Sequence, residues 1–340
     1  MLYSLARAAL FRLDPEVAHD FALKSLATLG PAVALLGAGA DRDESRMVMG
    51  IRFPNPVGLA AGLDKNGEYI DALAALGFGF LEIGTVTPRP QPGNAKPRMF
   101  RLVEHEAIIN RLGFNNQGVD RLLRNVERSS FAGVLGINIG KNFDTPNDQA
   151  ASDYLTCLDA VYARASYVVV NISSPNTQNL RELQSSERLD ELLAALMERR
   201  DALAARHGAT KPLLVKIAPD LDDAQIASIA ALAVTHRVDG LIATNTTVSR
   251  DAVAGHSHAS QAGGLSGRPL FGPSTKILSK LAAEVQGRVP LVGVGGIMDG
   301  AGARAKIDAG ASLVQLYTGF IYDGPRLIAQ ARKACRAITA

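Results

Sequence analysis

Short, almost continuously apolar runs recur along the chain and are separated by longer amphipathic stretches. The runs are rich in Val, Ile, Leu and Gly and do not alternate between polar and apolar positions. Strands that are buried on both faces of a parallel sheet show this pattern. Eight such strands are predicted, at residues 57–62, 78–86, 134–140, 167–173, 213–218, 240–246, 291–296 and 312–318.

Amphipathic helices are predicted between these strands, at residues 68–76, 117–125, 150–164, 186–206, 222–234, 274–285 and 300–309. Strands and helices that alternate in this way imply parallel strands with right-handed crossovers. Eight such units match the size of an α/β fold of the (β/α)8 TIM-barrel type. A doubly wound open sheet fits less well, because its first turn normally reads GxGxxG, whereas the first turn here reads AAGLDKNG.

Residues 1–45 precede the barrel and predict an N-terminal helical hairpin, so the expected domains are 1–45 and 46–340. Apolar residues repeat at helical spacing over residues 2–13, and Asp14-Pro15-Glu16 has the composition of a helix N-terminus. The second helix is expected to end at Gly30-Pro31. Two interpretations are open: a cap packed on the barrel, or a hydrophobic foot in the membrane interface that admits a lipid-soluble partner. Burial of four leucines would contribute about 6–12 kcal/mol, which favours reversible surface attachment over anchoring.

Composition narrows the functional classes. Of the 340 residues, 47% are hydrophobic and 20% are charged, so an ordinary buried core is expected. The net charge is only +3, Trp is absent and no basic stripe occurs, so nucleic acid is not an expected partner. Cys157 and Cys335 form no CxxC pair and HExxH is absent, so no metal site is expected. No secretory signal is predicted, and the apolar stretch 31–40 is too short to span a bilayer.

The carboxyl ends of the strands carry the active site in barrels of this kind, and here they hold amides, hydroxyls and two lysines. Carboxylates are almost missing, which argues against metal-assisted hydrolysis and two-carboxylate glycosidase chemistry. Side chains of these kinds suit an anionic ligand and a flat heteroaromatic molecule. The residues at these ends are 61–65, Thr85, Asn138, Asn171, 173–176, Lys216, 244–246, Gly295, Gly296, Tyr317 and Thr318.

Gly295 and Gly296 predict a phosphate site, because glycines let the backbone approach an anion and the next helix points N–H groups at it. The competing interpretation is a plain tight turn. Lys216 projects from the middle of an apolar strand, where a buried ammonium needs a partner. Either an acid on a neighbouring strand neutralises it, or it faces an anionic cofactor such as a flavin.

Ser174 lies in the run NISSPNT, which also has the composition of an ordinary turn. No histidine lies nearby in the sequence and GxSxG is absent, so a Ser-His-Asp hydrolase is not indicated. The segment 87–118 is too long for a plain barrel turn. It predicts either a functional loop or an extra hairpin that closes the barrel mouth.

Taken in order, the motifs of the chain resemble those of the dihydroorotate dehydrogenase family. They are NPVGLAAGLDKNGE, IGTVTPRPQPGNAKPRMFRL, NRLGFNNQG, GINIGKN, NISSPNT, VKIAPDL, ATNTT, GGLSGRPL, VGVGGI and LVQLYTGF. They cover nearly the whole chain, so the resemblance is specific. It implies a barrel that binds one FMN per chain and oxidises dihydroorotate to orotate in pyrimidine biosynthesis.

The resemblance also implies which residues bind the ligands. FMN is expected to contact Ala60, Ala61, Gly62, Leu63, Asp64, Lys65, Thr85, Asn138, Asn171, Lys216, Thr244, Gly267, Gly295, Gly296, Tyr317 and Thr318. Dihydroorotate is expected to contact Lys65, Asn110, Arg111, Leu112, Gly113, Phe114, Asn171, Asn176, Asn245 and Thr246. Amide side chains suit a ring of alternating C=O and N–H groups, and an ammonium suits its carboxylate.

Ser174 matches the position of the family's general base, which takes a proton from C5 of the substrate while hydride leaves C6. A serine base together with the N-terminal helices resembles the class 2, quinone-linked branch, since the soluble branch has cysteine as base. His19 and Arg101 match residues that line the quinone tunnel of that branch. The resemblance further implies a monomer attached through these helices to the cytoplasmic side of the cell inner membrane, as a peripheral protein.

Two alternatives stay open at this point. The first is a soluble FMN-dependent dihydroorotate dehydrogenase that uses fumarate or NAD. The second is a non-catalytic barrel that binds a phosphorylated ligand, which would be colourless when purified.

Overall fold

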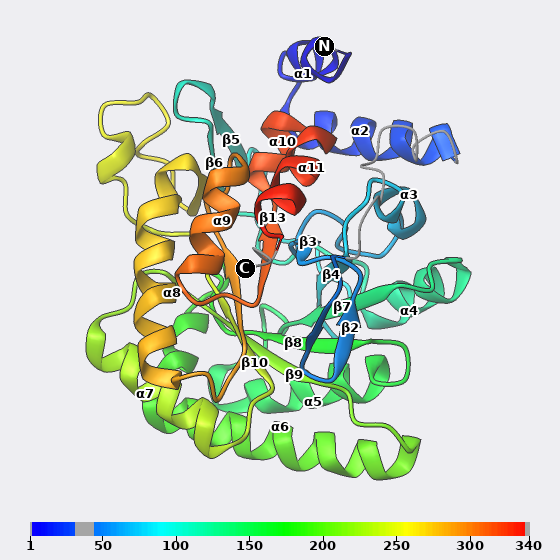
Figure 1. Ribbon diagram of the computed structural model, residues 1–340, viewed down its shortest axis with the longest axis vertical. Helices are drawn as coiled ribbons and strands as arrows, with labels where there is room; N and C mark the ends of the chain where they lie inside the picture. The colour runs from blue at the N-terminus through cyan, green and yellow to red at the C-terminus, as the bar shows by residue number, and fades with distance from the viewer. Residues whose placement is uncertain (1, 31–43, 337–340) are drawn as a thin grey trace.

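Eight parallel strands close into a barrel at the centre of the molecule (Figure 1). The structure, a computed structural model, describes residues 2–30 and 44–336. All eight predicted strands are confirmed, and most end earlier than predicted because their last residues leave the sheet for the loops. In order around the barrel they are β3 (Val57–Leu59), β4 (Phe80–Val86), β7 (Val134–Ile139), β8 (Tyr167–Asn171), β9 (Leu213–Ile217), β10 (Gly240–Ala243), β12 (Leu291–Val294) and β13 (Leu313–Leu316), and β13 pairs with β3.

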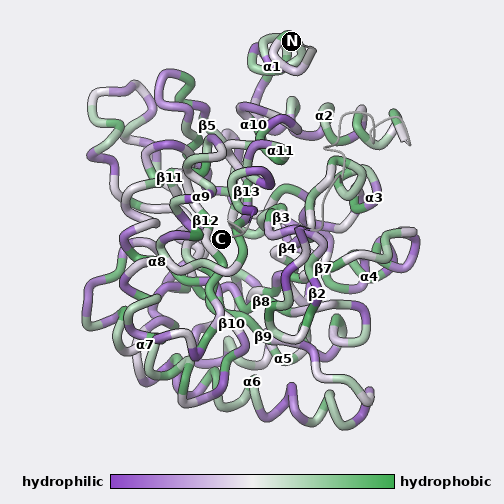
Figure 2. The backbone as a smooth tube through the Cα atoms, in the orientation of Figure 1, coloured by the Kyte–Doolittle hydropathy of each residue, from purple (hydrophilic) through white to green (hydrophobic). Residues whose placement is uncertain are grey.

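Helices surround the barrel, and the seven predicted between the strands are confirmed. They are α3 (Ile70–Ala74), α4 (Val119–Arg128), α5 (Ala150–Val161), α6 (Ser186–His207), α7 (Asp223–Thr235), α8 (Phe271–Val285) and α9 (Gly300–Asp308). Helix α8 begins three residues before its predicted start, because Pro273 is tolerated in a first turn. Two helices after the last strand, α10 (Thr318–Asp323) and α11 (Pro325–Ala334), were not predicted. Figure 2 shows predominantly apolar strands inside and alternating polar and apolar positions on outer helices such as α6.

The amino end of the barrel is closed by an unpredicted hairpin, β1 (Arg46–Val48) and β2 (Ile51–Phe53). The ring of Phe53 packs edge-on against Phe80, the first residue of β4, at 5.1 Å between centroids. Tyr167, the first residue of β8, lies 6.4 Å from both rings. All three side chains are buried, so this end of the barrel is a packed apolar core.

A small antiparallel sheet stands at the opposite end, over the barrel mouth. Strands β5 (Met99–Leu102) and β6 (Ala107–Asn110) form the hairpin that was one of the two interpretations of segment 87–118. Strand β11 (Gly264–Gly267) pairs with β6 and was not predicted, because the run GGLSG lacks the β-branched residues typical of strands. The sheet brings Asn110 opposite Gly264, so residues far apart in sequence meet at the mouth.

Two N-terminal helices, α1 (Leu2–Leu10) and α2 (Pro15–Leu29), lie at this same end. Helix α1 packs against α10, while α2 packs against α3 and β5. The Asp14 side chain caps α2 by accepting from the backbone N–H of Glu16 and Val17, as the composition predicts. Residues 31–43, which include the apolar stretch 31–40 and most of the end of the expected first domain, lie outside the described residues.

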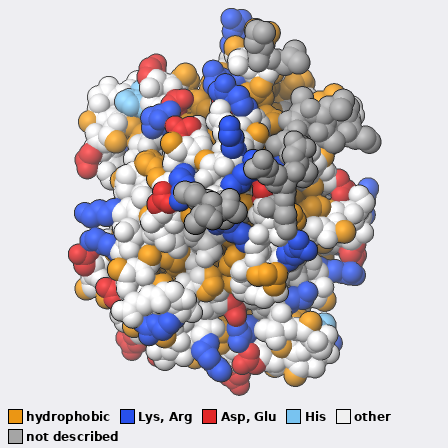
Figure 3. Space-filling view, in the orientation of Figure 1, with side chains coloured by type: hydrophobic (Ala, Val, Ile, Leu, Met, Phe, Trp, Pro, Cys, Tyr) orange, Lys and Arg blue, Asp and Glu red, His pale blue; other side chains and the backbone are white. Residues whose placement is uncertain are grey.

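Several large apolar side chains are exposed on and between these helices, alongside charged ones. Of the nine exposed large hydrophobic residues found in the described chain, five lie between residues 5 and 29: Leu5, Leu13, Val17, Phe21 and Leu29. The side chains of Leu5 and Phe21 are 72% and 59% exposed. On the face seen in Figure 3, lysines and arginines are interspersed with acids over the rest of the surface. No helix among the described residues is long and apolar enough to cross a membrane.

Candidate functional site

The main pocket opens at the carboxyl ends of the barrel strands, under the β5–β6–β11 sheet. The residues that line it include these from the sequence prediction: Ala60, Ala61, Gly62, Lys65, Thr85, Asn110, Leu112, Gly113, Phe114, Asn171, Ser174, Asn176, Lys216, Thr244, Asn245, Thr246, Gly267, Gly295, Gly296, Tyr317 and Thr318. The fold therefore brings most of the predicted FMN and substrate residues together with the predicted base. They come from every strand end except that of β7.

Buried amides inside the barrel are held by a continuous hydrogen-bond network. Asn138 donates from Nδ2 to Glu82 Oε1 at 2.8 Å and accepts at Oδ1 from Thr85 Oγ1 at 2.6 Å. Asn171 donates to Thr85 Oγ1 at 3.0 Å and accepts at Oδ1 from Asn245 Nδ2 at 3.4 Å. Because each amide has fixed partners on neighbouring strands, its donor and acceptor sides are oriented before any ligand binds.

Lys216 is buried on β9 and lines the pocket. No hydrogen bond or ion pair of its ammonium occurs within residues 2–30 and 44–336. Burial lowers its pKa, and the carboxylate of Glu82 partly offsets that effect. Glu82 itself accepts from Asn138 and from Gln315, so its charge is already solvated by amides. The interpretation of Lys216 as half of an ion pair with a neighbouring acid is therefore not supported, and its charge faces the pocket.

Lys65 is the second cation of the pocket. Burial lowers the pKa of its ammonium to about 8, although the carboxylate of Glu16 on α2 acts in the opposite direction. The guanidinium of Arg98 lowers the pKa further. Lys65 also lines a smaller pocket beside α2, so it stands between the barrel mouth and the N-terminal helices.

Glycine turns form one end of the main pocket. At Gly296, where φ is 73°, an added Cβ would lie 2.4 Å from the backbone nitrogen of Phe271 at the start of α8. No side chain fits at this junction, so main chain forms the pocket wall at Gly295 and Gly296. On the other side, Thr318 Oγ1 donates to Ser266 Oγ at 2.9 Å. This end suits a phosphate, and the lysines suit the polar edge of a flat cofactor.

A buried lysine supports this turn from behind. Lys306 on α9 donates from Nζ to Ser274 Oγ at 2.6 Å, and the Ser274 hydroxyl contacts the carbonyl of Gly295 at 3.0 Å. Burial lowers the pKa of Lys306 to about 7. Lys306 was not predicted from the sequence, because the pattern of apolar positions along α9 does not set it apart from the other polar residues of that helix.

Ser174 is buried and follows β8 by three residues. Its Oγ accepts a hydrogen bond from the backbone N–H of Asn176 at 3.2 Å. No histidine or carboxylate is among the residues that line the pocket. The hydroxyl of Thr177 is also buried and has no hydrogen-bond partner within the described ranges.

Four predicted ligand residues lie outside the lining of the main pocket. Asn138 stands behind Thr85 and Asn171 in the network described above. Asp64 accepts from the backbone N–H of Glu68 and Tyr69, and burial raises its pKa. Arg111 points away, because it donates to Gln261 and to the carbonyl of Pro97. Leu63 lines the smaller pocket.

The smaller pocket lies against α2 and contains His19, Leu63 and Lys65. Burial lowers the pKa of His19 to about 4, and the positive charge of Lys65 acts in the same direction, so the imidazole is neutral near pH 7. Arg101 does not line this pocket. Its guanidinium donates to the carbonyls of Phe11 and Leu13, where it caps the carboxyl end of α1.

Six lining residues were not predicted: Ser266, Leu270, Val294, Ile297, Gln315 and Gly319. Gln315 could have been found from the sequence, because it lies two positions before Tyr317 and alternate residues of a strand face the same side. Ser266 and Leu270 could not, because they belong to the unpredicted β11 and the turn after it.

Comparisons with known proteins show the family of the chain. A family model described as dihydroorotate dehydrogenase matches residues 45–338. A protein of Paraburkholderia phymatum named dihydroorotate dehydrogenase (quinone) is 61% identical over 335 residues, 98% of this chain and 97% of its own. A protein of Thiobacillus denitrificans with the same name is 62% identical over 329 residues, 96% of this chain and 97% of its own.

The fold has close relatives among solved structures. The crystal structure of DHODH from Eimeria tenella in complex with ferulenol matches with a TM-score of 0.86 and 40% identity, over 94% of this chain and 90% of that one. The ligand-free form from the same organism matches with a TM-score of 0.83 and 39% identity, over 94% of each chain.

Proposed function

The chain belongs to the dihydroorotate dehydrogenase family, and from that membership we infer that it oxidises dihydroorotate to orotate in pyrimidine biosynthesis, with a quinone as electron acceptor. The family implies a flavin cofactor. The observation that carries the inference is the pocket in which three features meet: a buried ammonium that has no hydrogen bond or ion pair within the described part of the chain, a glycine turn and a set of fixed amides.

The flavin is FMN, bound once per chain with its phosphate at the glycine turns. Gly267, Gly296 and Thr318 would hold the phosphate, and Lys216 would neutralise the polar edge of the ring system. The fit rests on two features of the described residues: a Cβ has no room at Gly296, and the ammonium of Lys216 forms no hydrogen bond or ion pair with them. Bound FMN supplies hydride acceptance, which no side chain of the pocket can provide.

Dihydroorotate would lie against the amides at the mouth. Asn176 donates from Nδ2 to Asn110 Oδ1 at 3.2 Å, and its own Oδ1 is buried without a partner in the described chain. That oxygen can accept from a ring N–H of the substrate. The ammonium of Lys65 would bind the substrate carboxylate. Asn245 and Thr246 would contact the opposite edge of the ring.

Ser174 would act as the general base and remove the proton from C5. A hydroxyl is a weak base, so Ser174 must pass its own proton through a relay to solvent as it takes the proton from C5. The backbone N–H of Asn176 points at Ser174 Oγ and stabilises the negative charge that the oxygen carries between the two proton transfers.

The quinone would approach between the N-terminal helices, through the smaller pocket beside His19. A neutral imidazole can donate a hydrogen bond to a quinone carbonyl, and the lowered pKa of His19 keeps it neutral. Arg101 contributes by fixing the end of α1. The exposed apolar side chains of α1 and α2 would lie in the interface of the cytoplasmic side of the cell inner membrane, with the protein as a peripheral monomer.

One anaerobic experiment tests the function. Purified protein is expected to be yellow, to lose its flavin absorbance when dihydroorotate is added, and to recover it on addition of a quinone. Protein that stays oxidised with dihydroorotate would contradict the proposal. Fumarate and NAD, added in place of the quinone, are expected to restore no absorbance; rapid recovery with either would favour the soluble type of enzyme.

Phe21→Asp tests the membrane contact. The exposed ring is expected to insert among lipids, so the variant should sediment less with vesicles that contain anionic lipid. Reduction by dihydroorotate should be unchanged. Met47→Asp, on the β1–β2 hairpin at the amino end of the barrel, provides the control, because it also replaces an exposed apolar side chain with a negative charge. Equal sedimentation of the two variants would contradict the proposed membrane surface.

A further inference from the structure

Arg181 connects three loops at the barrel mouth, although it does not line the main pocket. It lies on η4 (Leu180–Gln184), the short helix after β8. Its Nε donates to the carbonyl of Ser173 at 3.1 Å, and its Nη2 donates to the carbonyl of Thr246 at 2.7 Å. The third nitrogen, Nη1, donates to Asp220 Oδ2 at 2.7 Å. The loops after β8, β9 and β10 therefore share one guanidinium.

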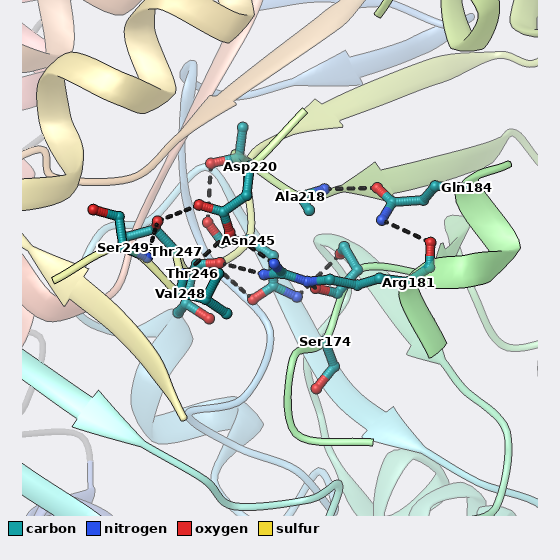
Figure 4. A network of polar contacts seen from close by, with 12 residues as sticks. Ser174, Arg181, Gln184, Ala218, Asp220, Asn245, Thr246, Thr247, Val248 and Ser249 are labelled. Carbon is teal, nitrogen blue, oxygen red and sulfur yellow. Dashed lines mark hydrogen bonds and ion pairs between the residues drawn. The ribbon is translucent and has the colours of Figure 1, made fainter. Parts of the chain in front are cut away.

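Asp220 extends this network along the loop after β10. Its Oδ1 accepts from Thr247 Oγ1, and its Oδ2 accepts from the backbone N–H of Val248 at 3.0 Å. Gln184 adds a second link between the first two loops, because its Oε1 accepts from the backbone N–H of Ala218 at 2.9 Å. Figure 4 shows these contacts around the guanidinium.

The geometry excludes direct participation of Arg181 in proton removal. In Figure 4 the side chain of Ser174 points away from the guanidinium, and no contact joins the two. The bonded carbonyl is that of Ser173, which belongs to the peptide group leading into Ser174. That bond sets the direction of the peptide plane and hence the direction in which the Ser174 side chain leaves the backbone.

We propose that Arg181 is a positioning residue for oxidation of the substrate: it fixes Ser174 relative to the loop that carries Asn245 and Thr246. The inference rests on the proposed function. A planar guanidinium can bind three acceptors in fixed directions, whereas a lysine ammonium on a flexible stem cannot. Misplacement of a reacting group by about 1 Å can cost about 100-fold in rate.

The substrate side of the site has anchors of its own. Asn245 Nδ2 donates to Ser173 Oγ at 3.1 Å and lies 3.4 Å from Asn171 Oδ1. These bonds do not involve Arg181. Its loss is therefore expected to affect the placement of the base more than the binding of the substrate.

Arg181→Lys and Asp220→Asn test the proposal. The first retains the charge but not the three fixed donors, and the second turns one acceptor oxygen into a donor. In both holoenzymes the limiting rate of flavin reduction by dihydroorotate is expected to fall at least tenfold. The dissociation constant of orotate should change less than threefold. The rate of reoxidation by a water-soluble quinone and the flavin content should stay within twofold of the unmodified protein.

A double variant separates positioning from general loss of structure. If Arg181 acts through Ser174, then in the Ser174→Ala background Arg181→Lys should change the reduction rate by less than twofold. Arg200→Lys is the matched control. Arg200, like Arg181, forms an ion pair, here with Asp201 at 2.8 Å and Asp239 at 2.6 Å, but it lies at the amino end of β10. The Arg200→Lys substitution should lower the thermal stability of the protein without slowing flavin reduction in the loaded enzyme.

The outcomes are distinct. Unmodified protein that dihydroorotate does not reduce would remove the proposed function. Unmodified protein that is reduced, with both single variants within twofold of it, would overturn the role of Arg181 alone. Parallel loss of flavin content, stability and both half-reactions, or a full tenfold effect in the Ser174→Ala background, would also overturn it.

Discussion

The two ends of the barrel differ in the side chains that line them: one end is apolar and the other is polar. At the amino end, Phe53, Phe80 and Tyr167 fill the interior with aromatic rings. At the carboxyl end the same strands present amides, hydroxyls and the ammonium of Lys216, which has no protein partner among the described residues. The difference teaches that stability and chemistry are separated along the strand axis, so substitutions at one end should leave the other largely unaffected.

The division also applies to the polar groups. At the amino end, Asp239 accepts from Arg200 at 2.6 Å and from the backbone N–H of Leu213 at 2.8 Å. These contacts tie α6 to the beginnings of two strands. At the carboxyl end, Arg181 instead binds the main chain of loops that carry proposed site residues. Similar pairs thus support the fold at one end and the site at the other.

Ser174→Ala should give the largest effect, confined to the carboxyl end. Removal of a general base typically slows a reaction about 10²–10⁴-fold, so reduction of the flavin by dihydroorotate should slow to that extent. Flavin content and urea unfolding should be unchanged. Rapid anaerobic mixing measures the rate. A near-normal rate would remove the base assignment.

Phe53→Ala should give the converse result at the amino end. Loss of a buried phenyl ring is expected to lower the free energy of unfolding by about 3–5 kcal/mol, measured by urea denaturation. The rate of flavin reduction in the loaded enzyme should stay within about twofold, a change below 0.5 kcal/mol on the scale of about 1.4 kcal/mol per tenfold. A large loss of rate in folded, loaded protein would break the separation of the two ends.

Lys216→Ala tests whether the carboxyl end sacrifices stability for binding. Charge-assisted hydrogen bonds contribute about 1.5–3 kcal/mol, so the affinity for FMN should fall about 10- to 100-fold by fluorescence titration. Because a buried ammonium without a partner is unfavourable, the flavin-free protein should unfold at the same or higher urea concentration. Unchanged FMN affinity would return Lys216 to a purely structural role.

The smallest expected effect is a pH dependence of orotate binding. Because the pKa of Lys65 is lowered to about 8, its ammonium loses the proton as pH rises through that value. The orotate carboxylate then loses its cation, so the dissociation constant should rise about tenfold between pH 7 and 9. Lys65→Arg, which stays charged, should abolish this slope. The same slope in that variant would assign the dependence elsewhere.

The fold was predictable because apolar runs and helical stripes are local signals. All eight barrel strands and seven helices follow from them. Hairpin β1–β2 was missed because each of its strands has only three residues. Strand β11 was missed because it lacks β-branched residues and pairs with a strand that is distant in the sequence. The placement of α1 and α2 against α10 and β5 depends on tertiary contacts, which no periodicity reveals.

The site was predictable to the extent that strand ends converge in a barrel. Lys216 and Asn171 follow from that rule. It could not be predicted that Asn138 lies behind the pocket or that Arg111 turns toward Gln261. Each residue lies in a motif whose side chains can point into the pocket or away from it. The role of Arg181 could not be predicted, because nothing in the sequence distinguishes an arginine that joins three loops from any other arginine between two strands.

The pairing of β13 with β3 has a consequence for synthesis of the protein. The first barrel strand has an unpaired edge until nearly the whole chain has left the ribosome, because its second neighbour is the last strand. Thr318, which follows that strand, also lines the pocket. Nascent and truncated chains that lack this part therefore have an incomplete pocket, and they expose a sheet edge on which aggregation can start.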